Sequence, residues 1–322
     1  MGITDAYGRS ISYLRVSVTD RCNFRCSYCM PAGATHWFPQ REILSYYEML
    51  RIIRVAVKAG ISKVRITGGE PLVRKDLVHF IAAIKRIPGI HDLSMTTNGS
   101  LLTQYAVELK KAGLDRLNIS LDTLREERFT KIAGRGMFRQ VLLGIESAEQ
   151  AGFSPKINVV VMNGINTDEL LDFARISLEK PCEIRFIEYM PFNTDDRNLL
   201  FPTSQVKKIL NEAGWGNLTE QPCGDGPATV FRFSEARGRI GFISSISDHF
   251  CNQCNRIRLT ADGRLKPCLL SNTEIGIKKM LRTGASEDDL EKLIRRSIWQ
   301  KPSQHDLSQI RVFRRGMSQI GG

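Results

Sequence analysis

Short apolar runs alternate with longer segments of helical spacing along the first two-thirds of the chain. The run Lys63–Thr67 is followed by a helical pattern over Asp76–Ile87, and the run Asp92–Thr97 by one over Leu102–Ala112. Short apolar runs are typical of buried strands, whereas apolar positions three or four residues apart predict amphipathic helices. We therefore predict repeated strand–helix units in this part of the chain.

The series contains six such units and opens with a strand at Ile11–Val18 and a helix at Tyr46–Ala59, which stops at Gly60. The remaining strands and helices are expected at Arg116–Ser120 and near Phe138–Ala151, at Lys156–Val161 and Thr167–Leu178, and at Glu183–Glu188 and Ser204–Ala213. Parallel strands joined by right-handed crossovers form α/β sheets. The series therefore predicts a parallel sheet curled into a partial or complete barrel, with the chemistry at the C-terminal ends of its strands.

The pattern changes after Gly224-Asp225-Gly226-Pro227. Two short strand-like segments, Thr229–Phe233 and Arg239–Ile243, lead into a second group of cysteines, and helical segments follow. Glycine and proline clusters of this kind mark loops between structural elements. We therefore predict a boundary near residue 225, with one domain over residues 1–225 and a smaller one over residues 226–322.

Composition limits the classes of protein to consider. The 322 residues are 42% hydrophobic, which suffices for a full core, and no apolar stretch approaches the roughly 20 residues of a membrane span. Met1–Ser10 has no apolar signal core, so we expect a cytoplasmic protein. Of the net charge of +12, +8 comes from Gly226 onward, where 17 basic residues stand against 9 acidic ones. This excess suits an anionic partner, although a solvated basic surface is the alternative.

Three cysteines, Cys22, Cys26 and Cys29, follow the first predicted strand with C-x3-C-x2-C spacing. Three thiolates on one short loop can hold three irons of a cubic iron–sulfur cluster and leave the fourth iron open to a small molecule. Structural zinc usually takes four ligands, often from paired C-x2-C sets. The spacing therefore favours an open cluster.

The turn Thr67-Gly68-Gly69-Glu70-Pro71 ends the second predicted strand. Adjacent glycines let the backbone approach a ligand closely, and Glu70 adds an acceptor that could bind the ammonium of an amino-acid-like cofactor. Polar residues also end later strands, at Met95–Gly99, Asn118–Asp122 and Ile187–Pro191. Each alone suits capping or packing, but together they indicate the lining of a pocket at the rim of a barrel.

Three cations, Arg15, Arg65 and Lys156, stand inside predicted strands. A charged side chain buried without a partner is costly. Pointing inward, these cations could together hold an anion, whereas exposure at the strand ends is the alternative. Arginine is the better side chain for bidentate contact with phosphate.

The second cysteine group consists of Cys251-Asn252-Gln253-Cys254 and Cys268, a C-x2-C-x13-C set. Arg256 and Arg258 follow it and would share one face of an extended segment. A second open cluster beside two arginines could bind an electron-rich ring and a phosphate chain. A zinc site completed by His249 is the alternative. We read the two remaining cysteines, Cys182 and Cys223, as small buried apolar residues.

The first cysteine motif followed by the GGEP turn resembles the radical S-adenosylmethionine superfamily. The second cysteine set, its R-x-R segment and the terminal Gly321-Gly322 narrow the resemblance to the GTP 3′,8-cyclase family, over Tyr7 to Gly322. This resemblance implies an α/β fold, an incomplete TIM-type (βα)6 barrel with a smaller C-terminal iron–sulfur domain closing the open side.

The resemblance also implies roles for individual positions. One [4Fe-4S] cluster would be held by Cys22, Cys26 and Cys29, and a second by Cys251, Cys254 and Cys268. S-adenosylmethionine would contact Tyr28, Gly69, Glu70, Ser120 and Met190. GTP would contact Arg15, Arg65, Thr96, Lys156, Arg256, Ile257 and Arg258, with Thr97 as the alternative to Thr96. Catalytic roles would fall to Arg256, Arg258, Gly321 and Gly322.

The implied activity is that of a radical lyase in molybdenum cofactor biosynthesis, which converts GTP to 3′,8-cyclo-7,8-dihydro-GTP by H3′ abstraction and C3′–C8 bond formation. The implied partners are GTP, a reductant protein, the next enzyme (cyclic pyranopterin monophosphate synthase) and a second copy of the chain, with neither membrane nor nucleic acid. The residues alone leave two other classes open. One is a radical enzyme acting on a peptide or RNA, and the other is a zinc-stabilised nucleic-acid-binding protein without catalysis.

Overall fold

The computed structural model describes residues 2–30, 37–191, 194–222, 224, 226–305 and 315–321. The chain divides into two compact units. The first contains Met1–Thr97, Val107–Arg116 and Cys251–Gly322, and the second contains Asn98–Ala106 and Leu117–Phe250. Segments from both ends of the sequence therefore fold together in the first unit. The domain boundary expected near residue 225 stays a prediction, and Asp225 itself lies outside the described residues.

The first unit contains strands in the order β14-β13-β12-β3-β4-β5. Strands β12, β3, β4 and β5 run parallel, and β13 and β14 extend the sheet antiparallel. Their bounds are Tyr13–Ser17 for β3, Lys63–Thr67 for β4, Asp92–Thr97 for β5, Arg256–Leu259 for β12, Arg264–Lys266 for β13 and Ile275–Gly276 for β14. A separate hairpin pairs β1 (Ile3–Thr4) with β2 (Ser10–Ile11).

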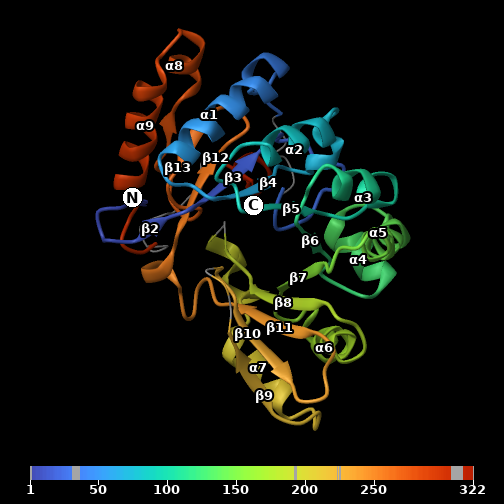
Figure 1. The fold of residues 1–322 in the computed structure, drawn as a ribbon. Helices are drawn as coiled ribbons and strands as arrows, with labels where there is room; N and C mark the ends of the chain where they lie inside the picture. The colour runs from blue at the N-terminus through green and yellow to red at the C-terminus, as the bar shows by residue number, and fades with distance from the viewer. Residues whose placement is uncertain are drawn as a thin grey trace. The chain divides into compact units, whose positions relative to one another are not determined.

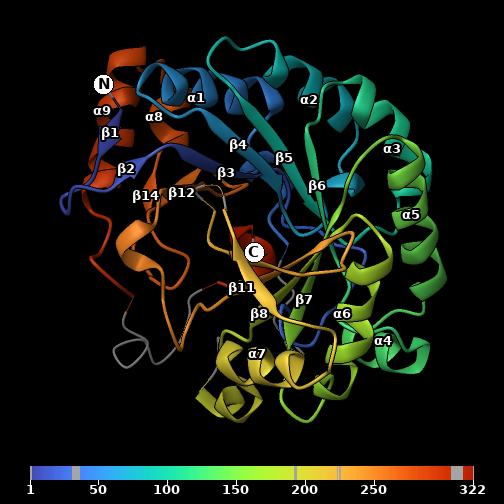
Figure 2. The ribbon, with the colours of Figure 1, turned by 60° about the horizontal axis from the view of Figure 1, so that its bottom comes forward.

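The second unit contains strands in the order β6-β7-β8-β11-β10-β9. Strands β6, β7, β8 and β11 run parallel, and β10 and β9 follow antiparallel. Their bounds are Arg116–Ser120 for β6, Lys156–Val161 for β7, Glu183–Glu188 for β8, Leu218–Gln221 for β9, Thr229–Phe233 for β10 and Arg239–Ile243 for β11. Figure 2 shows helices α6 (Leu170–Glu179) and α7 (Thr203–Asn211) beside β8 and β11.

Helix α1 (Tyr46–Lys58) shows why these segments form helices. Ser45 caps its first turn: the Ser45 side chain accepts from the Glu48 N–H at 3.2 Å, and the Glu48 carboxylate accepts from the Ser45 N–H at 2.7 Å. Gly60, with φ of 118°, follows the end of the helix, and a Cβ there would lie 2.9 Å from Gly2 Cα. Glycine therefore ends this helix and lets the N-terminal hairpin pack against it.

The remaining helices, in chain order, are α2 (Leu77–Lys85), α3 (Leu102–Lys111), α4 (Glu126–Ala133), α5 (Phe138–Gln150), α8 (Lys278–Arg282), α9 (Glu287–Trp299) and α10 (Met317–Ile320). Within the first unit, α1, α8 and α9 lie together beside β12 and β13 (Figure 1). Ile52, Ile53, Ile294 and Ile298 of α1 and α9 are almost completely buried.

Most predicted strands are confirmed. The bounds agree with the structure for β4, β5, β6, β7, β8, β10 and β11. The predicted strand Ile11–Val18 is wrong as one element, because Ile11 pairs with β1 whereas Tyr13 begins β3. The predicted helix at Thr167–Leu178 begins with a 3₁₀ turn and becomes α-helical only from Leu170. Helix α4 was not predicted at all.

Candidate functional site

The first cysteine loop follows β3. The Cys29 and Met30 N–H groups donate to the Cys26 carbonyl at 3.0 and 2.9 Å, and the Phe24 N–H donates to Cys22 Sγ at 3.3 Å. All three cysteines are partly exposed. In the part of the chain that the structure describes, no group of three or more His, Cys, Asp or Glu side chains is gathered to hold a metal ion. The fit of these thiols to an iron–sulfur cluster therefore rests on their chemistry and on their spacing in the sequence, and not on a preformed group of ligands.

The Gly-Gly-Glu turn packs directly against this loop. The Gly69 N–H donates to the Thr19 carbonyl and the Glu70 N–H to the Arg21 carbonyl, both at 2.8 Å. A Cβ on Gly68 would lie 2.7 Å from the Thr19 carbonyl oxygen, and one on Gly69 would lie 2.7 Å from that of Asp20. No side chain larger than hydrogen fits this approach. The two predicted cofactor-binding motifs are thus one packed structure.

Glu70 is fully buried and fastens this turn to β5. Its Oε1 accepts from the Leu72 N–H at 3.0 Å and from the Thr97 hydroxyl at 2.8 Å. The hydroxyl of the neighbouring Thr96 is also buried, but it makes no hydrogen bond to any described residue. A buried hydroxyl without a partner is unusual and indicates a missing ligand or water. The geometry therefore favours Thr96 over Thr97 as a ligand contact.

The central feature of the first unit is a line of cations across neighbouring strands. Arg258 of β12 lies in register with Arg15 of β3, and Arg15 with Arg65 of β4. Lys266 of β13 lies in register with Arg258 on its other side. Register partners share one face of a sheet. We call these four residues the cation row.

Arg65, Arg258 and Lys266 of the cation row are buried, and Arg15 is partly buried. Burial, together with the charges of Arg258 and Arg65, lowers the pKa of Arg15 well below its usual value. Burial and the charge of Arg256 lower the pKa of Arg258 to about 10. For Lys266, burial is again the main cause of a pKa of about 8. Like charges in register destabilise a sheet, so an anion bound here would relieve their repulsion.

Residues beside the row complete the same face. Arg65 Nε donates to Ser94 Oγ at 3.2 Å, and the Arg65 guanidinium lies 5.3 Å from the centre of the Tyr13 ring. Arg256 stands two residues before Arg258 and, as predicted, shares its face. Ile257 points to the opposite face and is buried, in register with Leu14. Only the backbone of Ile257 can therefore serve a ligand on this side.

The second cysteine group surrounds the start of β12. Arg256 donates to Cys254 Sγ at 3.5 Å, and buried Lys301 donates to the Arg256 and Pro267 carbonyls, both at 2.9 Å. Although burial opposes it, the charges of Arg256 and Lys301 lower the pKa of the Cys254 thiol to about 6. Burial raises the pKa of Cys251, and the neighbouring Cys268 and Cys254 add to this effect. In the described part of the chain these three thiols do not form a group that could hold a metal ion, so the case for a cluster here rests on their chemistry and spacing.

The C-terminal segment lies on the face of the sheet that carries the cation row. The Arg258 guanidinium donates to the Gly321 carbonyl at 2.7 Å. A Cβ on Gly321, whose φ is 71°, would lie 3.1 Å from Ser17 Cβ and would overlap the Thr67 hydroxyl. Gly322 lies outside the described residues.

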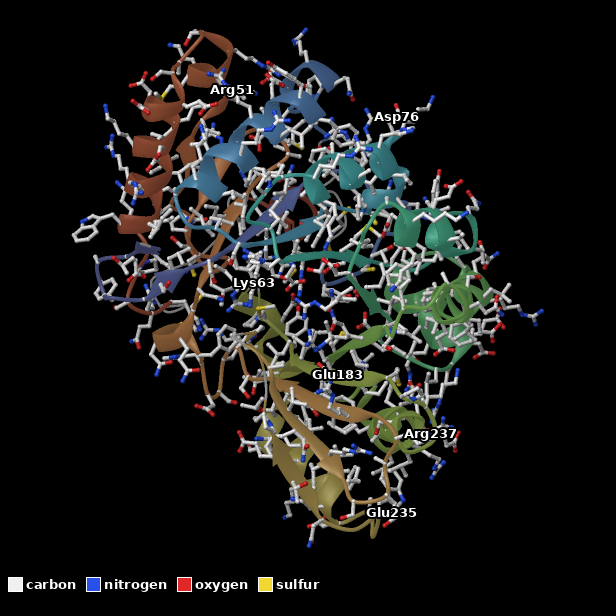
Figure 3. All side chains as sticks on the ribbon, in the orientation of Figure 1. Arg51, Lys63, Asp76, Glu183, Glu235 and Arg237 are labelled. Atoms are coloured by element: carbon white, nitrogen blue, oxygen red, sulfur yellow. The ribbon has the colours of Figure 1, made fainter. Side chains whose placement is uncertain are left out.

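In the second unit, Lys156 begins β7 and donates to Glu183 Oε2 at 2.8 Å. Arg185 pairs with the same carboxylate and lies 3.4 Å from the Asn118 side-chain oxygen. Figure 3 shows Glu183 on β8, whereas Glu235 and Arg237 lie on the turn that joins β10 to β11. Neither Glu183 nor Arg185 was predicted as a site residue, because neither belongs to a motif.

The other predicted residues of this unit also lie at its strand ends. Ser120 ends β6 in register with Asn158, whose buried side-chain oxygen has no hydrogen-bond partner among the described residues. Met190 follows β8 and is half-buried. Cys182 is buried, as predicted, whereas Cys223 lies outside the described residues. Among the described helices, none is long and apolar enough to cross a membrane.

Two family models match the sequence. The model of the radical SAM superfamily covers residues 16–176, and that of Molybdenum Cofactor Synthesis C covers residues 182–307. A GTP 3′,8-cyclase of Heliobacterium modesticaldum is 49% identical, over 99% of both chains. A GTP 3′,8-cyclase of Thermodesulfovibrio yellowstonii is 47% identical, again over 99% of both chains. Molybdenum cofactor biosynthesis protein 1 of Bos taurus is 43% identical over 94% of this chain and 48% of its own.

Solved structures share the fold at low sequence identity. Streptococcus suis SuiB bound to its precursor peptide SuiA has a TM-score of 0.63 at 17% identity, covering 96% of this chain and 76% of the other. SuiB bound to S-adenosylmethionine has a TM-score of 0.61 at 18% identity, covering 88% and 68%. These likenesses show an α/β fold, consistent with an incomplete TIM-type barrel.

Proposed function

Because the chain belongs to the GTP 3′,8-cyclase family of radical SAM enzymes, we propose that it binds GTP on the cation row. Its activity is the cyclisation of GTP in molybdenum cofactor biosynthesis, and its first cysteine motif serves a [4Fe-4S] cluster and S-adenosylmethionine. The observation that carries the substrate site is the buried register of Arg258, Arg15 and Arg65. A triphosphate is the anion that such a line of guanidinium groups suits best.

The residues around the first cysteine loop fit the proposed cofactor. Cys22, Cys26 and Cys29 would hold the cluster, while Tyr28 and the turn at Gly69 and Glu70 would orient S-adenosylmethionine. When bound, the cluster and S-adenosylmethionine supply a 5′-deoxyadenosyl radical for abstraction of the ribose H3′ of GTP. The chain's part is to hold C3′ near C8 of the guanine, and fixing two reacting atoms this way is a large share of catalysis.

For the second cysteine group we propose a second [4Fe-4S] cluster, held by Cys251, Cys254 and Cys268. Arg256, which contacts Cys254, would then lie between this cluster and the cation row. The guanine would be held near the cysteines and the triphosphate along the row, with Thr96 as a further contact. The roles expected for Lys156, Ser120 and Met190 in the second unit, and for Gly322, stay predictions.

Further proposals concern what surrounds the reaction. Cleavage of S-adenosylmethionine needs an electron, so a reductant protein must deliver one. The cyclised nucleotide would pass to cyclic pyranopterin monophosphate synthase. A cytoplasmic location suits a chain with six of its eight cysteines in two compact motifs, because cytoplasmic proteins use cysteines for metal binding or catalysis more often than for disulfides. A homodimer remains a prediction.

One anaerobic experiment tests the function. Reconstituted protein is incubated with S-adenosylmethionine, GTP and dithionite, and the products are identified by mass spectrometry. We expect 5′-deoxyadenosine together with a cyclised nucleotide, and about eight irons per chain if both clusters form. A colourless protein that holds zinc would refute the proposal, as would cleavage of S-adenosylmethionine without any change in GTP.

The second cluster is tested separately by Cys254→Ala. This variant should retain about four irons per chain and still cleave S-adenosylmethionine, because the first cysteine loop is intact. Cyclised nucleotide should be lost. An unchanged iron content would show that the second group holds no cluster.

A further inference from the structure

Arg315 makes a buried ion-pair cluster at the Lys266 end of the cation row, because Lys266 lies 4.0 Å from Glu274, one of its carboxylates. Its two terminal nitrogens donate to the two carboxylate oxygens of Asp262, both at 2.9 Å. Its Nε lies 3.0 Å from Glu274 Oε1. The side chains of Arg315, Asp262 and Glu274 are 14%, 8% and 13% exposed. Bidentate pairing of this kind fixes both the position and the orientation of a guanidinium group.

The Asp262 carboxylate, which holds Arg315, is joined to the cation row through the backbone. Asp262 lies in the turn between β12 and β13, the two strands that carry Arg258 and Lys266. Thr260 donates to Asp262 at 2.7 Å, which fixes the carboxylate within that turn. The anchor for Arg315 is therefore part of the same hairpin as the cations.

Five residues separate Arg315 from Gly321, and they cross the proposed active site. A Cβ on Gly316 would lie 3.4 Å from the carbonyl oxygen of Cys29, so the segment passes the first cysteine loop. Ser318 and Ile320 are buried. Gly321 then reaches Ser17 and Thr67 and accepts from Arg258. We call residues 316–321 the tail segment.

The position of Gly321 along β3 and β4 shows which proposed ligands it lies next to. Arg15 and Arg65 lie in register, and Ser17 and Thr67 form the next pair on the same face. Two residues of a strand span about 7 Å. The Gly68-Gly69 turn follows Thr67 directly. Gly321 therefore lies between the level proposed for the triphosphate and the level proposed for S-adenosylmethionine.

We infer that Arg315 is a positioning residue: its ion pairs with Asp262 and Glu274 hold the tail segment so that Gly321 stays against Arg258 and Thr67. This inference rests on the proposed function. Arg315 is paired with Asp262 and Glu274, so it acts on the site through the tail segment. Gly321, at the end of that segment, makes the contact with Arg258. We call these ion pairs of Arg315 the clasp. Without it, the tail segment would be held by the Arg258–Gly321 hydrogen bond and by the burial of Ser318 and Ile320.

The test uses full-length, reconstituted protein with Arg315→Gln and Arg315→Lys. Arg264 lies 3.4 Å from Asp262 and 3.6 Å from Glu274, so both carboxylates keep a cation in either variant and the hairpin should stay folded. Arg282→Gln is the matched control, because Arg282 pairs with Glu48 at 2.7 Å on α1, outside the site. Iron content and circular dichroism verify that each variant is folded and loaded.

Two measurements are then decisive. Hydrogen exchange, read by mass spectrometry, should speed up by roughly tenfold or more in the tail segment of Arg315→Gln and remain unchanged in Arg282→Gln. The kcat for cyclisation should fall by roughly tenfold or more, whereas the Kd for GTP should stay within about threefold, because the cation row is intact. Arg315→Lys should recover part of the slow exchange in the tail segment and part of the kcat, since lysine restores the charge but not the bidentate contact.

The inference is overturned if tail exchange is the same in Arg315→Gln and wild type, or if kcat is unchanged. It is also overturned if GTP affinity and kcat fall together in Arg315→Gln and in the control, which indicates general destabilisation. If the wild-type protein forms no cyclised nucleotide, the proposed function fails first, and the reaction that Arg315 would serve fails with it. Tail exchange alone then reports whether the clasp exists.

Discussion

Arg258 of β12 and Arg15 of β3 lie in register on adjacent parallel strands and share one face, where Arg258 is buried and Arg15 partly buried. Two positive charges in this relationship oppose folding unless an anion accompanies them. The arrangement therefore stores repulsion in the unliganded protein, which ligand binding would relieve. This relationship yields the first prediction.

Arg15→Met should weaken GTP binding by roughly tenfold to a hundredfold, or about 1.4–2.7 kcal/mol. The same change should leave the free energy of unfolding of the ligand-free protein unchanged or raise it, because an apolar side chain of similar length replaces a buried charge. Calorimetric titration with GTP and urea unfolding measure the two effects.

Arg282→Met serves as the control, since it removes an outer arginine from the same unit. It should leave GTP affinity unchanged. Arg15→Met with undiminished affinity for GTP would show that the row does not hold the triphosphate. Arg256→Ala should likewise weaken GTP binding, and an unchanged Kd would remove Arg256 from the site.

Gly321→Ala should lower kcat by roughly tenfold or more. The new Cβ would overlap the Thr67 hydroxyl, and the φ of 71° is strained for alanine by about 1 kcal/mol. Gly284→Ala is the matched control, because Gly284 has a φ of 84° and a Cβ there would meet nothing within 4 Å. Equal losses of kcat in both variants would assign the effect to backbone strain rather than to the site.

Thr96→Val and Thr97→Val should separate structure from binding. Thr97 donates to buried Glu70, so its replacement should cost about 1–2 kcal/mol in the free energy of unfolding. Thr96 makes no such bond to a described residue, so its replacement should leave stability nearly unchanged and weaken GTP binding. Chemical denaturation and calorimetry measure these quantities. The reverse pattern would transfer the binding role to Thr97.

Glu183→Gln should destabilise the protein by about 3 kcal/mol at pH 7, because it leaves Lys156 and Arg185 without their buried counter-charge. Although burial raises it, the charges of Arg185 and Lys156 lower the pKa of Glu183 below its ordinary 4.5. A carboxylate with a lowered folded pKa stabilises the fold above its unfolded pKa, and this contribution is lost as pH falls through the folded pKa.

The difference in unfolding free energy between wild type and Glu183→Gln should therefore be largest at pH 7. It should shrink as the pH falls below 4.5, the ordinary pKa of a glutamate. Urea unfolding across this range measures the difference. Glu235→Gln, in the exposed turn between β10 and β11, should show neither the loss nor the pH dependence. A difference that is constant with pH would mean that Glu183 is not ionised in the fold.

The strands could be predicted because each is a local apolar run. In Lys63–Thr67 and Glu183–Glu188 the apolar residues lie between polar ends, and a short apolar stretch of this kind is typical of a buried parallel strand. The split of Ile11 from Tyr13 could not be foreseen, because it depends on β1 pairing with Ile11 while β4 and β12 pair with Tyr13. The alternation of side chains along a strand determines which face of the sheet each residue occupies, but not which strand it pairs with.

The site shows the same division. The cysteines and the Gly-Gly-Glu turn are contiguous in sequence, so their chemistry can be read directly. The meeting of Arg258 with Arg15 depends on strands that lie far apart in the sequence, and no local signal encodes it. The clasp of Arg315 on Asp262 and the pairing of Glu183 with Lys156 are likewise tertiary contacts of residues outside any motif.

Strand β12 has a consequence for how the protein is made. Its partner β3 emerges from the ribosome about 240 residues earlier, so the sheet of the first unit must wait for nearly the whole chain. Contacts so distant in sequence form slowly. Until β12 arrives, β3 presents an unpaired edge, and we expect nascent chains to need protection from self-association during this interval.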